Sequence, residues 1–164
     1  MTKYIDFYFD FISPYSYLAI HKLKTLKNYE EININYKPIL LGGLHNLGGI
    51  TAPAFNERKL KNMKFDCNLI AKKNNIQFKW NDNFPINSLY LMRGYLVIDK
   101  ELKNKFFDLC FDAYWKNNED ISNLEIPTGN PLVINFSESL KVVKARYLDE
   151  VRAVSYTHLR AHET

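Results

Sequence analysis

An aromatic run that ends in a Ser-Pro pair constrains this chain more than any other stretch. Residues 4–12 are aromatic or β-branched with little interruption, which predicts a central strand buried on both faces. Ser13 and Pro14 follow, and this pair is typical of a helix start, because serine accepts from first-turn amides and proline loses no hydrogen bond there. We therefore expect a helix to begin at Ser13, with its positive end directed at an anion.

Two serines are spaced across this helix start. Ser13 and Ser16 occupy the outer positions of an x-Pro-x-x box, where thioredoxin-like redox proteins carry Cys-x-x-Cys. Serine cannot form the mixed disulfide that thiol exchange requires, so disulfide oxidoreductase activity is not expected. For the Ser-Pro pair alone, a plain helix cap is the alternative interpretation.

The next hundred residues alternate between strand and helix patterns. Residues 14–27 show helical periodicity, and residues 32–36 alternate as in a strand with one wetter face, so the chain opens with a βαβ unit. Paired glycines bracket a predicted loop at residues 42–49. The glycines either let the backbone approach a ligand closely or only allow the chain to turn. The loop contains a lone His45, which is expected to be solvated. Further helices are expected at residues 56–74, 88–98 and 100–115.

Composition excludes several classes of protein. With 46% apolar residues, 24% charged residues and a net charge of +4 spread along the chain, the sequence is globular and lacks a nucleic-acid-binding stripe. Cys67 and Cys110 lie far apart without zinc spacing, so we expect buried free thiols and no metal site. No secretory leader or long apolar run is recognisable, so we expect no membrane partner and a cytoplasmic location.

Ordered motifs over the first 120 residues resemble the 2-hydroxychromene-2-carboxylate isomerases, relatives of the kappa-class glutathione transferases and the periplasmic disulfide oxidoreductases. The matching segments are residues 7–19, 38–43, 53–54 with Lys59 and Asp66, and 84–89 with Arg93. The resemblance implies an α/β fold: a thioredoxin-like βαβ core with a helical insertion. It also implies a small aromatic substrate and a homodimer.

The resemblance assigns roles to five residues. Ser13 is implied to be catalytic and to contact the sulfur of glutathione, with Pro14 and Lys59 beside it in the cofactor site. Asn46, Lys59 and Asn87 are implied to hold the substrate, although relatives commonly carry a lysine at the place of Asn46. The alternatives are a surface role for Lys59 and a helix cap for Asn87.

The end of the sequence departs from this pattern. Residues 146–164 hold three of the five arginines and two of the four histidines but no Lys, Asn or Ile. We interpret residues 1–145 as an incomplete thioredoxin-like domain and residues 146–164 as a non-native tail, with the second half of the core missing or replaced. Before the tail, residues 132–136 are compatible with a strand and residues 139–151 with a helix.

The function expected from the resemblance is a glutathione-dependent isomerase that converts 2-hydroxychromene-2-carboxylate to trans-o-hydroxybenzylidenepyruvate. A kappa-type glutathione transferase is the first alternative, because it would use the same serine without isomerisation. An inactive fragment of either enzyme is the second.

Overall fold

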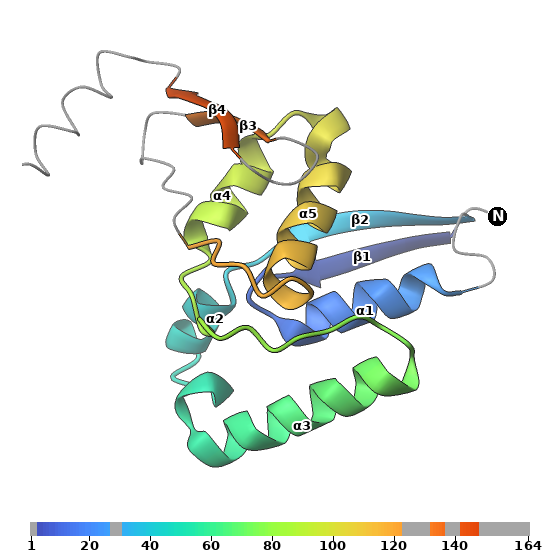
Figure 1. Cartoon of the computed structure of the whole chain (residues 1–164), viewed down its shortest axis with the longest axis vertical. Coiled ribbons are helices and arrows are strands. Elements are labelled where there is room, and N and C mark those ends of the chain that lie inside the picture. Colours follow the sequence, from blue (N-terminus) through green and yellow to red (C-terminus); the bar gives the residue numbers. More distant parts are fainter. Residues whose placement is uncertain (1–2, 27–30, 123–131, 137–141, 148–164) are drawn as a thin grey trace, which may run out of the picture. The chain divides into compact units, whose positions relative to one another are not determined.

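The computed structural model describes residues 3–26 and 31–122, together with the backbone of residues 132–136 and 142–147. The chain divides into two compact units, Met1–Asn123 and Leu124–Thr164 (Figure 1). Within the described residues, no helix is long and apolar enough to cross a membrane.

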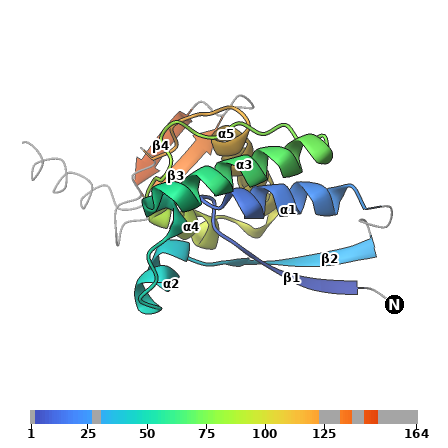
Figure 2. The ribbon, with the colours of Figure 1, turned by 90° about the horizontal axis from the view of Figure 1, so that it is seen from below.

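The first unit opens with a parallel βαβ unit, as predicted. Strand β1 (Lys3–Phe9), helix α1 (Pro14–Lys24) and strand β2 (Ile32–Pro38) follow in order, and the two strands pair from Lys3↔Ile32 to Phe9↔Pro38. In Figure 2 the strands form one layer, and α1 and α3 lie on the same side of it. The α/β class predicted from the sequence is therefore confirmed for this unit.

The predicted burial of the first strand on both faces is wrong. Phe7 and Phe9 are buried, but Tyr4 and Tyr8 are 77% and 60% exposed on the opposite face. The strand also ends at Phe9 rather than at residue 12. It ends because the chain turns there: Ser13 N–H donates to the backbone oxygen of Asp10 at 2.9 Å.

Helices make up the rest of the first unit. Their bounds are α2 Leu41–Leu47, η2 Pro53–Phe55, α3 Glu57–Lys73, α4 Leu89–Val97, η3 Lys100–Leu102 and α5 Lys103–Trp115. The loop predicted at residues 42–49 is wrong for most of its length, since the glycine pair is accommodated inside α2. Its turn comes afterwards, where Gly49 adopts a φ of 61° that favours glycine.

An aromatic core fixes the end of β1 against α5. Phe9 and Phe107 have ring centroids 4.8 Å apart, and those of Phe11 and Phe111 are 5.1 Å apart. Trp115 is fully buried and donates its indole N–H to the backbone oxygen of Phe11 at 2.9 Å. These contacts hold the turn that leads into Ser13, so the position of the helix start is set by the core.

Cys67 and Cys110 are buried free thiols, as predicted.

The second unit contains a two-stranded antiparallel sheet. Strands β3 (Leu132–Phe136) and β4 (Val142–Tyr147) pair from Leu132↔Tyr147, with an irregularity at Asn135/Phe136. The strand predicted at residues 132–136 is confirmed. The helix predicted at residues 139–151 is wrong for residues 142–147, where β-branched Val142 and Val143 favour a strand. Residues 148–164, most of the predicted tail, lie outside the described residues.

Candidate functional site

A cavity of about 1120 Å³ lies where the turn after β1 meets α2 and the start of α4. Its walls come from residues 12–15, from α2 and the segment through Phe55, from Met63 of α3 and from residues 84–89. Ser13, Pro14, Asn46 and Asn87 all line it. The structure therefore brings four of the five predicted site residues together from three distant parts of the sequence.

Ser13 caps α1, as predicted. Its hydroxyl oxygen accepts the N–H of Ser16 at 3.2 Å, and Pro14 occupies the first helical position. Because the oxygen serves as the acceptor in the cap, the hydroxyl proton stays available to donate to a ligand. The backbone N–H of Tyr15 has no acceptor within the described part of the chain. Two donors at the positive end of a helix thus border the cavity.

Tyr15 is a site residue that the sequence interpretation missed. Its side chain lines the cavity, and its hydroxyl donates to Asp66 Oδ2 at 2.9 Å. Burial and this hydrogen bond to a carboxylate both raise the pKa of Tyr15. The phenol therefore stays neutral, and the contact ties the first turn of α1 to α3. The match at Asp66 hinted at this contact, but nothing in the sequence paired it with Tyr15.

The segment before α4 forms the opposite wall. The Phe84–Pro85 peptide bond is cis, and Asn87 Oδ1 accepts the N–H of Leu89 at 3.1 Å. The N-cap of α4 is Ser88, so the N-cap predicted at Asn87 is wrong: Asn87 lies one residue earlier and bonds the amide two residues on, as in an Asx turn. This bond uses only the carbonyl oxygen, so the two N–H donors of the Asn87 amide remain for a ligand.

The cavity wall carries little charge. Among the residues that line it, none is Lys, Arg, Asp or Glu, and His45 is the one able to carry a positive charge. Apolar surface dominates, with Phe55, Met63 and Phe84 among its members. Such a lining suits an aromatic ligand with few polar groups.

Lys59 does not line the cavity. It lies exposed on the first turn of α3, where its N–H donates to Asn56 Oδ1 at 3.0 Å. Met63, which does line the cavity, follows four residues later and so lies on the same face of the helix. The structure places Lys59 one turn outside the site. Within the described residues, no cluster of His, Cys, Asp or Glu is suited to hold a metal ion.

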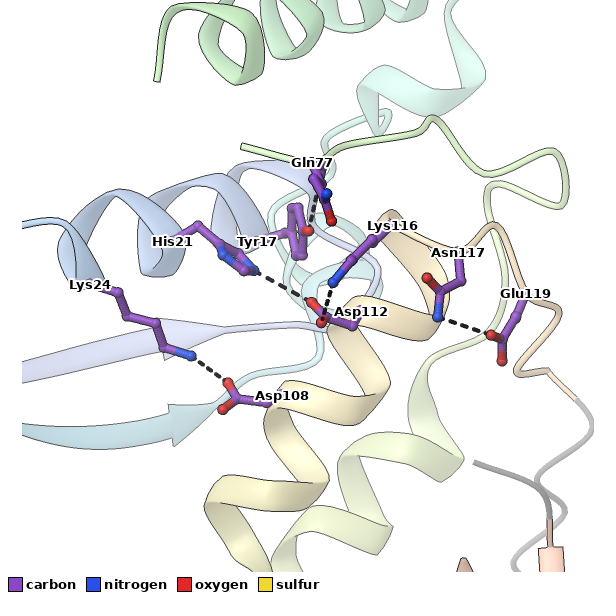
Figure 3. Close-up of polar contacts among 9 residues, drawn as sticks. All are labelled: Tyr17, His21, Lys24, Gln77, Asp108, Asp112, Lys116, Asn117 and Glu119. Atoms are coloured by element: carbon purple, nitrogen blue, oxygen red, sulfur yellow. Dashed lines mark hydrogen bonds and ion pairs between the residues drawn. The ribbon is translucent and has the colours of Figure 1, made fainter. Parts of the chain in front are cut away.

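Polar contacts outside the cavity join α1 to α5 (Figure 3). His21 Nε2 lies 3.6 Å from Asp112 Oδ1, and Lys24 Nζ lies 2.7 Å from Asp108 Oδ1. Burial alone would raise the pKa of Asp112, but hydrogen bonds and charges from His21 and Lys116 outweigh it and lower that pKa. The half-buried contact between His21 and Asp112 joins α5 to the helix that presents Ser13.

Comparison with known proteins identifies one family and several individual relatives. Residues 4–127 match the model of the DSBA-like thioredoxin domain. A 2-hydroxychromene-2-carboxylate isomerase from Sphingobium xenophagum is 44% identical over 75 residues, which cover 44% of this chain and 38% of that protein. Glutathione S-transferase kappa 1 from Caenorhabditis elegans is 38% identical over 69 residues, covering 42% and 30% respectively.

A solved structure of a 2-hydroxychromene-2-carboxylate isomerase superposes with a TM-score of 0.62 at 27% identity. The superposition covers 71% of this chain and 58% of the isomerase. The chain therefore spans about half the length of the isomerases that it matches, or less.

Another relative carries the name of a different enzyme. A 2,3-bisphosphoglycerate-dependent phosphoglycerate mutase from Hyphomonas neptunium is 55% identical over 42 residues. That stretch covers 26% of this chain and 18% of the mutase. So short a part of the mutase carries no argument for its activity here.

Proposed function

Because this chain belongs to the DSBA-like thioredoxin domain family, we propose that it is a glutathione-dependent isomerase acting on a hydroxychromene carboxylate. Its relatives include isomerases and kappa-class glutathione transferases, so an enzyme of this isomerase and transferase group is the broader conclusion. The observation that carries the proposal is the placement of Ser13, which caps α1 and lines the cavity at the same time.

The residues at the helix start fit the sulfur of glutathione. The Ser13 hydroxyl and the Tyr15 N–H supply two donors, and the helix dipole adds positive potential at the same point. Helix N-termini lower the pKa of cysteine thiols, and the same field would favour the thiolate of a bound tripeptide. The cavity volume of about 1120 Å³ leaves room for the tripeptide and a small aromatic acid together.

The chain's own residues position the reactants. When bound, glutathione supplies the thiol whose reversible addition frees a carbon–carbon bond of the substrate to rotate. Ser13 and the Tyr15 amide hold the sulfur and stabilise its negative charge. The apolar side chains of Phe55 and Phe84 pack against the aromatic ring.

Polar groups for the substrate come from the other walls. Asn46 and Asn87 line the cavity and offer amide donors to a carboxylate or keto group. His45 adds the one side chain of the lining that can carry positive charge. Lys59 lies one turn before Met63 on α3, so in this proposal it contacts a ligand only at the rim of the cavity.

A kappa-type transferase is the second candidate. The likeness to the kappa enzyme from C. elegans favours it, and the same serine would stabilise the same thiolate. The difference lies in the fate of the second substrate, which a transferase conjugates and an isomerase releases rearranged. An inactive fragment is the third, because the chain spans only part of its relatives.

One assay separates these candidates. Purified chain is offered a hydroxychromene carboxylate or a chloronitroaromatic electrophile, each with and without glutathione. We expect glutathione-dependent turnover of the first substrate, reduced in Ser13→Ala and kept in Ser16→Ala, whose side chain does not line the cavity. Turnover of the electrophile alone would instead identify a transferase, and binding of glutathione without turnover would identify a fragment.

A further inference from the structure

Asp10 is a buried carboxylate to which the proposed reaction gives no role. It is 1% exposed and lies between the end of β1 and Ser13. Its Oδ1 accepts the N–H of Ile12 at 3.2 Å, and its Oδ2 accepts the N–H of Leu41 at 2.8 Å. The Ser88 hydroxyl also lies close enough to the carboxylate to act on its pKa, in the lowering direction.

Each of these three partners belongs to a different wall of the cavity. Ile12 precedes Ser13 in the turn, Leu41 begins α2, and Ser88 lies between Asn87 and α4. One carboxylate therefore joins segments separated by about thirty and eighty residues in the sequence. Among the described residues, no other side chain accepts the amides of both Ile12 and Leu41.

A carboxylate in this position is costly to bury. Burial raises the pKa of Asp10, while the N–H groups of Leu41 and Ile12 and the Ser88 hydroxyl act in the opposite direction. All of its partners are neutral donors, and no cation contributes to its environment among the described residues. Neutral donors hold an anion less well than a paired cation does, so a hydrophobic residue would pack here at lower cost.

We propose that Asp10 is a positioning residue whose carboxylate clamps the three walls of the cavity so that Ser13 faces the ligand at a fixed distance from α2 and α4. This inference rests on the proposed function for the identity of the ligand, but the clamp itself does not. The backbone oxygen of Asp10 already holds Ser13 N–H, and that bond survives any change of side chain. Substitution at position 10 therefore tests the carboxylate separately from the turn.

The first test needs no ligand. Amide hydrogen exchange is measured on the full chain and on Asp10→Asn, in which one of the two N–H acceptors is replaced by a donor. We expect the Leu41 or Ile12 amide to exchange about tenfold faster or more, as for loss of a charge-assisted bond, while the core amides of Phe9 and Ile20 stay protected. Unchanged exchange at both positions, or equal acceleration at all four, would overturn the clamp.

The second test avoids a change at the buried carboxylate. Leu41 is the first residue of α2 and follows an extended Leu40, so proline fits there and removes the N–H that Asp10 accepts, together with the leucine side chain. Leu41→Ala is the matched control, because it loses the side chain and keeps the N–H. We expect kcat to be about tenfold or more lower in Leu41→Pro than in Leu41→Ala, with similar melting temperatures. Equal kcat values would contradict the proposal.

The two failures are distinguishable. If wild-type chain neither binds glutathione by calorimetry nor turns over substrate, the proposed function fails, and the exchange experiment still decides the clamp. If wild-type chain is active and Leu41→Pro matches Leu41→Ala, the function stands and the clamp is wrong.

Discussion

The hydroxyl oxygen of Ser13 accepts the backbone N–H of Ser16 at 3.2 Å, so one serine of the box caps the helix through the amide of the other. This relationship separates two tasks of Ser13: its oxygen closes the helix start, and its proton is free for a ligand in the cavity. Variants can remove one task at a time.

Ser13→Asp is expected to keep the cap and lose the ligand. Aspartate is as good a cap as serine, so the free energy of unfolding should change by less than about 0.5 kcal/mol, whereas Ser13→Ala should lose about 1 kcal/mol. Glutathione affinity should fall in both variants, because Ser13→Ala loses the hydroxyl donor and the added negative charge of Ser13→Asp repels a thiolate. Urea unfolding and calorimetry measure the two effects, and retained affinity in Ser13→Asp would refute a role for position 13 at the sulfur.

His45→Gln is expected to weaken binding of a carboxylate-bearing substrate. His45 is the one residue of the cavity lining able to carry positive charge, and a charge-assisted hydrogen bond contributes about 1.5–3 kcal/mol. The KM for a hydroxychromene carboxylate should rise about tenfold or more. The KM for a chloronitroaromatic electrophile, which has no carboxylate, is the control and should stay constant. An equal rise for both compounds would show that His45 shapes the cavity without recognising charge.

Asp112 is expected to make stability depend on acid. Its folded-state pKa is lowered by His21 and Lys116 despite the opposing effect of burial, so its contribution is present above the usual range of about pH 4. That contribution is lost as the pH falls through the lowered folded-state pKa. Asp112→Asn should therefore flatten the loss of unfolding free energy between neutral pH and about pH 2.

Asp108→Asn is the matched control for that measurement. Asp108 pairs with Lys24, but its side chain is 54% exposed, and exposed pairs contribute little to stability. The Asp108 variant should follow the wild-type pH profile. If Asp112→Asn also followed it, the contact with His21 would have no energetic weight.

Phe11→Ala and Tyr8→Ala are expected to differ sharply although both lie in the same aromatic run. Phe11 is fully buried, and its loss should cost about 3–5 kcal/mol. Tyr8 is 60% exposed, and its loss should change stability by no more than about 0.5 kcal/mol. Urea unfolding compares them, and a large cost for Tyr8→Ala would mean that another surface covers this face of the sheet in solution.

Local chemistry explains what the sequence could predict. The Ser-Pro pair predicted the helix cap at Ser13, and the alternation of apolar and polar residues at 32–36 predicted strand β2. Helix α3 begins at Glu57 after the cap predicted at Asn56, whose side chain accepts the Lys59 N–H. Each of these features depends on residues within one turn of each other, so short-range rules suffice.

Features that depend on distant packing could not be predicted. Aromatic residues favour strands whether they are buried or exposed, so the sequence did not distinguish Tyr8 from Phe9. The glycine pair has the composition of a turn, yet it lies inside helix α2 in the folded chain. Tyr15 and Asp66, 51 residues apart, meet only in the folded chain.

The boundary between the two parts of the chain remains a prediction from composition. The proposed division at residues 145 and 146 rests on the change in arginine, lysine and asparagine content. Contacts in the structure divide the chain earlier, between Asn123 and Leu124, and the family match ends at residue 127. The described backbone of the second unit forms a separate two-stranded sheet.

A crystal structure of this chain with glutathione bound tests the central claim most directly. The account predicts that the sulfur lies within hydrogen-bonding distance of both Ser13 Oγ and the Tyr15 N–H, at the start of α1. A sulfur bound elsewhere in the cavity, in contact with neither group, would contradict it.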